Sequence, residues 1–295
     1  MRSLWITLIV LGALLSSMPA PWAASEAIPG IYALPDHRPK VTGELRATPT
    51  TGNAVALDFV MRKTGTTTPL RKYDIELTKQ LHVIAVSDDF ASFLHEHVDH
   101  VAKDGHFRLT MSFPHPGRYH VYADGTPSGI GQQVLRFDLP VASTEAPRSP
   151  APPEPSGLEG TDGTYTVKFD NLSLEAGKET MLELHILKGD QPARDVKPFL
   201  GVAAHAVFIN TTDLLYVHVH ATPLAGKTSG MGDMGAMAGR EHMQMAPTKA
   251  LRSSSVINPN LSLHVAPPES GIYKLWIQFT GGTQVRTVPF VVSVK

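Results

Sequence analysis

Apolar and polar residues alternate in short runs through most of the chain, and Gly, Pro, Asn or Asp interrupts each run. The segments 52–65 and 178–190 show the alternation clearly, and VRTVPFVVSV near the end of the chain indicates a closing strand. Period-two alternation between closely spaced turns is typical of an antiparallel β-sandwich. Helical periodicity is nearly absent after the first 25 residues, and ASFLHEHV at 91–98 is too short to predict a helix. We predict an all-β protein.

The second half of the chain repeats the first. Segment 81–97 aligns with 204–220, and 114–125 matches 268–279 through a Gly and a Tyr at the same places. Internal repeats of this kind indicate two copies of one structural unit.

Between the copies lies STEAPRSPAPPEPSG, at 143–157, a composition that favours an extended linker without apolar surface. We therefore predict two tandem β-sandwich domains that fold separately, at 40–142 and 160–295, the second with an insertion at 221–258.

Histidine occupies matched positions in both repeats. The two triplets are His82, His95 and His97, and His205, His218 and His220. In each, the second histidine follows the first by 13 residues and the third follows by two more. A turn sequence, SDD at 87–89 or NTTD at 210–213, divides each segment into two apolar runs, which predicts a β-hairpin.

A turn centred between Asp88 and Asp89 would place His82 opposite His95 and Gln80 opposite His97; the same construction puts His205 opposite His218. Residues i and i+2 of a strand share a face, and directly opposed Cβ atoms lie about 4.5–5.5 Å apart. Three imidazoles would then converge in each repeat, whereas a register of the other parity would separate the first histidine from the pair.

Three neutral imidazoles on one face suit a late first-row metal such as Cu, Zn or Ni. We predict a Cu(II) site in each domain, with zinc as the alternative ion. His100 follows the first triplet closely enough to be a fourth ligand, and Glu96 or Asp99 could supply oxygen. The alternative is that the histidines are half-exposed sheet residues, or core residues whose nitrogens are hydrogen-bonded.

A methionine-rich tract, MGDMGAMAGREHMQM, interrupts the second repeat. Its candidate ligands are Met231, Met234, Met237, His242, Met243 and Met245. Thioether sulfur is a soft ligand that selects Cu(I), so the tract favours copper over zinc, and silver would also fit. The alternative is a surface loop in which Met is incidental or packs on a partner protein.

The N-terminal segment and the composition indicate the cellular compartment and exclude some partners and ligands. Residues 1–25 carry Arg2 near their start, continue with the apolar run LWITLIVLGALL and end in small residues, the order of a secretory signal. We therefore expect a periplasmic or secreted protein with no membrane span after cleavage. The net charge of −1 without a basic stripe argues against nucleic acid. The chain has no Cys, which excludes disulfides and thiolate ligands.

The pattern of a His, about a dozen residues, HxH, a PxxGxY strand and a closing TxPFxV strand resembles the YtkA-like and CopC-like families of secreted bacterial metal-handling domains. The resemblance implies immunoglobulin-like (cupredoxin-like) sandwiches that handle copper. Two features depart from it. The expected mature start, Glu26 or Ile28, offers no N-terminal histidine, and a blue-copper site needs a Cys that the chain lacks.

These features together predict a periplasmic copper-binding protein for copper sequestration, delivery or resistance. Its partners would be metal ions and a copper exporter, an oxidase or another periplasmic copper protein. No GxSxG, HExxH or phosphate-binding glycine loop is present, so we do not expect an enzyme. The alternatives are an envelope protein-interaction module with incidental histidines, or a zinc- or nickel-binding protein.

Overall fold

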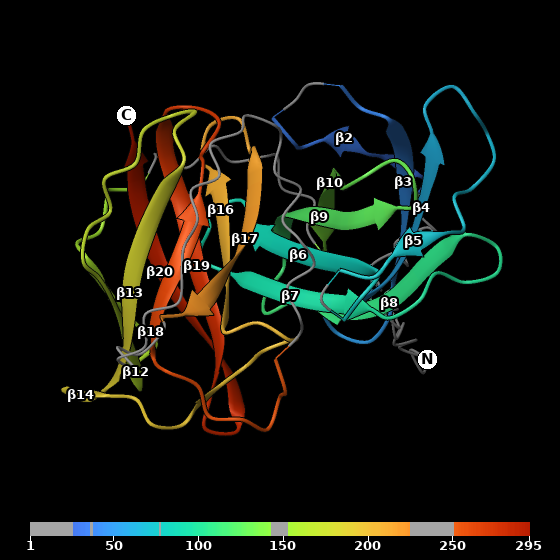
Figure 1. Cartoon of the computed structure of the whole chain (residues 1–295). Helices are drawn as coiled ribbons and strands as arrows, with labels where there is room; N and C mark the ends of the chain where they lie inside the picture. The colour runs from blue at the N-terminus through green and yellow to red at the C-terminus, as the bar shows by residue number, and fades with distance from the viewer. Residues whose placement is uncertain (1–25, 36–37, 77, 143–152, 225–250) are drawn as a thin grey trace, which may run out of the picture.

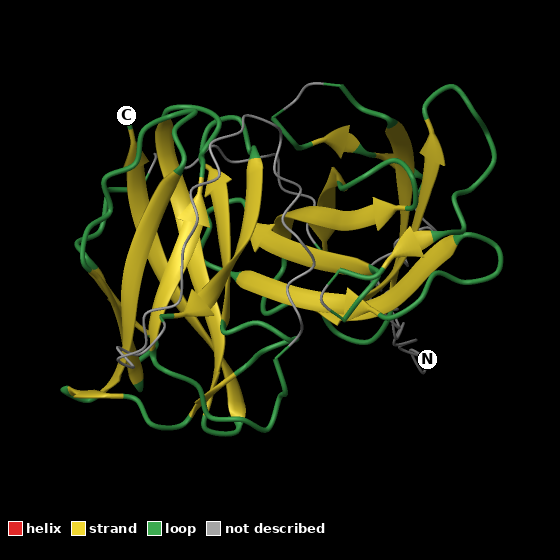
Figure 2. Ribbon diagram, viewed as in Figure 1, coloured by secondary structure: helices red, strands yellow, loops and turns green. Residues whose placement is uncertain are grey.

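The computed structural model describes residues 26–35, 38–76, 78–142, 153–224 and 251–295. All regular structure in these ranges is β-strand, as the sequence predicts (Figures 1 and 2). None of the described residues forms a helix of the length and apolarity needed to cross a membrane. The segment 1–25, which we predict to be a secretory signal, most of the linker and most of the insertion lie outside the described residues.

The first domain is a sandwich of two antiparallel sheets, ordered β1-β3-β4-β8 and β2-β10-β9-β6-β7, with β5 paired to β9. Its strands are β1 (Ile28–Pro29), β2 (Ile31–Tyr32), β3 (Val41–Pro49), β4 (Ala54–Lys63), β5 (Tyr73–Asp74), β6 (Leu81–Ser87), β7 (Phe93–Val98), β8 (His106–Ser112), β9 (Gly117–Pro127) and β10 (Gln133–Val141). The short strands β1 and β2 precede the predicted start at residue 40 and extend both sheets.

The second domain repeats this arrangement, but its strands form one continuous sheet because β17 pairs with β18. Its strands are β11 (Glu159–Thr161), β12 (Tyr165–Phe169), β13 (Thr180–Lys188), β14 (Gln191–Pro192), β15 (Val196–Lys197), β16 (Ala204–Asn210), β17 (Tyr216–Pro223), β18 (Asn260–Val265), β19 (Gly271–Gly281) and β20 (Gln284–Val294). The predicted closing strand is β20, and the aligned segments of the repeats become β4 and β13, β6–β7 and β16–β17, and β9 and β19.

Each domain has its own apolar core, filled by the inward-facing residues of the alternating strands. Val55, Leu57 and Phe59 of β4 are buried in the first core, and Leu182 and Leu184 of β13 in the second. Burial of alternate side chains on one face is what the period-two pattern predicts.

A third apolar cluster joins the two domains. This interdomain cluster consists of Ala33, Ile84, Val86, Phe90, Tyr122, Val134, Val207, Ile209, Tyr216 and Trp276. It fills the contact between the sheet face of β6, β7 and β9 and that of β16, β17 and β19, whose strands run across each other in Figure 1. The prediction that the domains fold separately rested on the linker, which lacks apolar surface, whereas the surface that joins the domains belongs to the sheets.

The central strands of this contact are buried on both faces. Every residue of β6 and of β16 is buried, because alternate side chains enter the domain core and the others enter the interface. In β6, for example, Val83 packs in the first core and Ile84 in the interdomain cluster. Strands covered on both faces read as continuous apolar runs, which is the pattern of HVIAV and HAVFI.

The predicted register of the histidine hairpins is wrong by two residues. His82 pairs with His97, and Ile84 pairs with His95; His205 pairs with His220 in the same way. The hairpin loops are longer than we expected and are centred one residue later along the chain. Phe90 closes the first loop with a φ of 56° and Leu214 the second with a φ of 63°. A shift of two residues keeps each side chain on its face, so the three histidines still share one.

Candidate metal centre

The first histidine triad lies on the β6–β7 hairpin. His82 Nδ1 is 3.4 Å from His95 Nε2, and His97 Nε2 is 3.0 Å from the same atom. Three nitrogens bound to one tetrahedral ion at 2.0–2.1 Å would be separated by about 3.3 Å. The nitrogens of this triad are therefore spaced as ligands of one ion.

The second triad repeats this geometry on the β16–β17 hairpin. His205 Nδ1 lies 3.0 Å from His218 Nε2, and each triad offers three ligand atoms within 4.8 Å of one another. His220 Nε2 is buried and has no hydrogen-bond partner among the described residues. A buried nitrogen without a partner is costly, and an ion would satisfy it.

The two triads face each other across the domain interface. The ring centroids of His82 and His218 are 5.4 Å apart, and those of His95 and His205 are also 5.4 Å apart. Six imidazoles, which we call the histidine cluster, thus occupy one buried region at the end of the interdomain cluster. The sequence predicted the two triads but not that they meet.

Burial and mutual repulsion keep the histidine cluster uncharged. Burial, with repulsion from His95 and His220, lowers the pKa of His82 to about 3, and burial lowers the pKa of His95 and of His220 to about 4. The pKa of His205 and that of His218 fall well below the usual value, also mainly through burial. The unprotonated imidazole is the form that binds metal, so near neutral pH the cluster has the protonation state that a metal site requires.

Hydrogen bonds from the far ring nitrogens fix which nitrogen faces the cluster. His95 Nδ1 donates to Gln278 Oε1 at 2.7 Å, and His205 Nε2 donates to the carbonyl of Phe199 at 3.1 Å. His218 Nδ1 lies 3.4 Å from Asp124 Oδ2. Metal-binding histidines are commonly oriented in this way by an acceptor behind the ring.

Asp124 is itself held in place inside the interface. It is 2% exposed and accepts hydrogen bonds from Gln132 Nε2 and from the Tyr216 hydroxyl, the latter at 3.2 Å. Burial, with repulsion from Glu76, raises the pKa of Asp124 to about 7. Its carboxyl group is thus a fixed acceptor behind His218.

Sequence reasoning missed Gln278 and Asp124, although a signal was present. The two residues occupy matched positions in the repeats, each five residues after the aligned Tyr119 or Tyr273. A polar residue at the same place in two otherwise apolar strands indicates a partner in the interior.

Among the described residues, the other predicted ligands His100, Glu96 and Asp99 are not part of the histidine cluster. His100 is exposed beyond the end of β7, and Glu96 is exposed on the strand itself. Asp99 forms an ion pair with Lys79. The candidate ligands of the methionine-rich tract, Met231, Met234, Met237, His242, Met243 and Met245, lie outside the described residues.

The remaining described histidines have partners elsewhere, His115 with Ser92 and His185 with Asp170 and Asn260. His120 lies between Asp88 and Asp138, His106 contacts Asp58, and His264 contacts Glu179. These three histidines contact carboxylates away from the triads, and none of the five extends the cluster.

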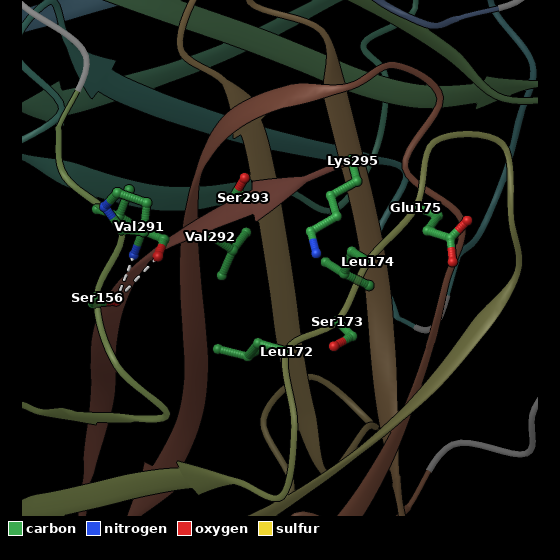
Figure 3. Close-up of a pocket in the computed structure, with 10 residues that line it drawn as sticks. Ser156, Leu172, Ser173, Leu174, Glu175, Val291, Val292, Ser293 and Lys295 are labelled. Carbon is green, nitrogen blue, oxygen red and sulfur yellow. Dashed lines mark hydrogen bonds between the residues drawn. The ribbon is translucent and has the colours of Figure 1, made fainter.

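A pocket of about 360 Å³ lies in the second domain, beside β20 and the segment that follows β12 (Figure 3). The Ser156 hydroxyl lines this pocket, donates to the Val291 carbonyl and accepts from the Val291 N–H. Glu175 and Lys295 are the titratable residues that line the pocket. The pocket contains none of the six histidines, so it adds nothing to the metal centre.

A family model matches the chain twice, at residues 37–142 and 159–295, and its description is "Domain of unknown function (DUF8832)". The chain belongs to this family. The matched ranges coincide with the two sandwiches, in agreement with a duplicated unit. No curated protein matches the chain.

Among solved structures, the chain is similar to Escherichia coli alpha-2-macroglobulin activated by porcine elastase, with 12% identity and a TM-score of 0.24 over 87% of this chain and 23% of that one. It is also similar to a glycosyl hydrolase family 2 member from Bacteroides cellulosilyticus, with 9% identity and a TM-score of 0.20 over 84% of this chain and 24% of that one. The chain thus spans about a quarter of the length of these structures.

Proposed function

We propose that this protein binds copper ions through the histidine cluster and sequesters them or passes them to another protein of the bacterial cell envelope. The observation that carries the proposal is the pair of triads, each with three imidazole nitrogens at ligand spacing in a buried, uncharged setting. Imidazole binds copper and zinc well, and the triads contain no carboxylate that would favour a harder ion.

Copper is preferred to zinc because of the methionine-rich tract in the sequence. Five methionines within residues 231–245 provide thioether sulfur, which binds Cu(I) and has little affinity for zinc. The leader-like segment 1–25 supports export to the envelope. Delivery to an exporter or an oxidase is the role that a carrier with both kinds of ligand would have.

Metal binding by the mature protein tests the proposal directly. Equilibrium dialysis against Cu(II), Zn(II) and Ni(II), followed by elemental analysis, should give one ion per histidine triad, with copper bound most tightly. The variants His95→Ala/His97→Ala and His218→Ala/His220→Ala should each lose one equivalent. The exposed His264 offers the matched control, and His264→Ala should bind as the unaltered protein does.

Spectroscopy identifies the ligands. The electron paramagnetic resonance spectrum of bound Cu(II) should show coupling to imidazole nitrogen, which the double variants lose at the affected triad. Absence of any binding tighter than about 10 μM would overturn the proposal and favour an interaction module with incidental histidines. Equal binding by the double variants would do the same.

A further inference from the structure

Residues at matched positions of the two domains make the same contacts across the interface in both directions. Phe93 of the first domain stacks on Trp276 of the second at 4.8 Å, and the matched residues Tyr216 and Tyr122 stack at 5.1 Å. In the histidine cluster, His82 approaches His218 just as His205 approaches His95. Such reciprocity is the property of a two-fold interface, here formed by the repeats of one chain.

The residues that orient the triads are also related by this symmetry. Gln278 of the second domain accepts the hydrogen bond of His95 in the first triad. Asp124 of the first domain, at the matched position, faces His218 in the second triad. The central histidine of each triad is therefore oriented from the opposite domain.

The orientation leaves lone pairs directed at one another. With His218 Nδ1–H directed at Asp124 and His205 Nε2–H directed at Phe199, the facing nitrogens of these rings both carry lone pairs, 3.0 Å apart. Two acceptors at this distance repel each other. A cation between them would turn the repulsion into coordination.

Resting on the proposed function, we infer that the two triads form one paired centre for two metal ions, in which each ion's central ligand is positioned by the other domain, His95 by Gln278 and His218 by Asp124. The pairing follows from the geometry. Each triad has the three nitrogens that one ion requires, and the rings of the two triads are in contact. Gln278 and Asp124 are positioning residues, because they act on the ion through a ligand.

The inference can be tested by changing Gln278 when only one triad remains. In the His218→Ala/His220→Ala background, only the first triad binds, and Gln278→Leu should lower its Cu(II) affinity about 10- to 100-fold, the usual effect of losing an orienting partner. In the His95→Ala/His97→Ala background, where the second triad binds, the same change should alter affinity by less than about twofold. Gln278→Glu, which keeps an acceptor oxygen, should restore binding to the first triad.

Asp124→Ala tests the reciprocal contact, which orients His218 in the second triad. It should weaken the second triad and leave the first unchanged, and thermal melts must confirm that each variant is folded. If Asp124→Ala does not fold, the Gln278→Leu comparison by itself tests the paired centre. The nitrogen coupling of Cu(II) should also change in the first triad with Gln278→Leu, which a loss of stability alone would not cause.

The outcomes separate the two proposals. Absence of metal binding in both double-variant backgrounds refutes the proposed function itself. If metal binds in both backgrounds and Gln278→Leu lowers the Cu(II) affinity equally in each, or in neither, the proposed function stands. The paired centre is then overturned.

Discussion

His95 and His218 show how a side chain with two nitrogens serves two purposes. One ring nitrogen of each hydrogen-bonds or faces a residue across the interface, and the other faces the centre of its triad. Imidazole suits this position because it remains neutral when buried and still offers a lone pair. An amide or a hydroxyl would bind a late transition metal more weakly.

Trp276 is the residue whose loss should most weaken the contact between the domains. It is 2% exposed and stacks on Phe93. Trp276→Ala removes a large buried aromatic side chain, and we expect it to lower the free energy of unfolding by about 3–5 kcal/mol. Urea unfolding of the metal-free protein measures the change.

The exposed Val285 in the neighbouring strand β20 provides the control, since Val285→Ala should change stability by less than about 0.5 kcal/mol. If Trp276→Ala were equally mild, the interdomain cluster would not form in solution.

At the level of elements, the two hairpins carry all six histidines of the cluster on strands that are fixed from several sides. β6 pairs with both β7 and β9, and β16 pairs with both β17 and β19, while both faces of β6 and β16 are covered. Ligands on such strands are held more rigidly than ligands on loops would be.

Hydrogen exchange should reveal this rigidity. We expect the amides of Leu81–Ser87 and Ala204–Asn210 to be among the slowest to exchange in the metal-free protein, because opening them requires separating both the sheet and the domains. Mass spectrometry of peptides from these strands tests this, with the exposed segment 188–191 as the reference. Rapid exchange of β6 and β16 would contradict the docked arrangement.

At the level of the whole molecule, the chain resembles a symmetric dimer whose subunits are joined by a linker. The interface combines apolar and aromatic contacts with six neutral histidines that are buried or half-buried. The two halves have separate cores, so each could fold, but folding alone would expose one face of β6 or β16 with its histidines.

The histidine cluster should make the metal-free protein sensitive to acid. The folded pKa of His82 is about 3 and that of His95 and His220 about 4, all below the unfolded value of about 6.5. Below pH 6.5 the unfolded chain therefore binds protons that the folded protein excludes, so stability falls as pH falls. Each such histidine should lower the free energy of unfolding by about 1.6 kcal/mol between pH 6.5 and pH 5.

Urea unfolding in the presence of a chelator at these two pH values measures the effect. The variant His97→Ala/His220→Ala should show a smaller loss, whereas His100→Ala, which changes an exposed histidine, should keep the full loss. A metal-free protein as stable at pH 5 as at pH 6.5 would show that the imidazoles are accessible to solvent.

Local patterns in the sequence were enough to predict the all-β fold, the repeat and the membership of each triad. Alternation has a period of two, so Val55, Leu57 and Phe59 had to share a face, and so did His95 and His97. The same parity made the triad prediction tolerant of the two-residue error in register. The loop lengths could not be predicted, because they depend on the positive φ angles of Phe90 and Leu214.

Only the tertiary structure decided that the two triads meet and which residues orient them. Contact between sheets depends on how two surfaces of separate domains fit, and no local pattern encodes that fit. The continuous apolar runs of β6 and β16 indicated two buried faces, but not what covered the second. Gln278 and Asp124 lie 183 and 94 residues from the histidines they face, a separation that only the docking of the two domains closes.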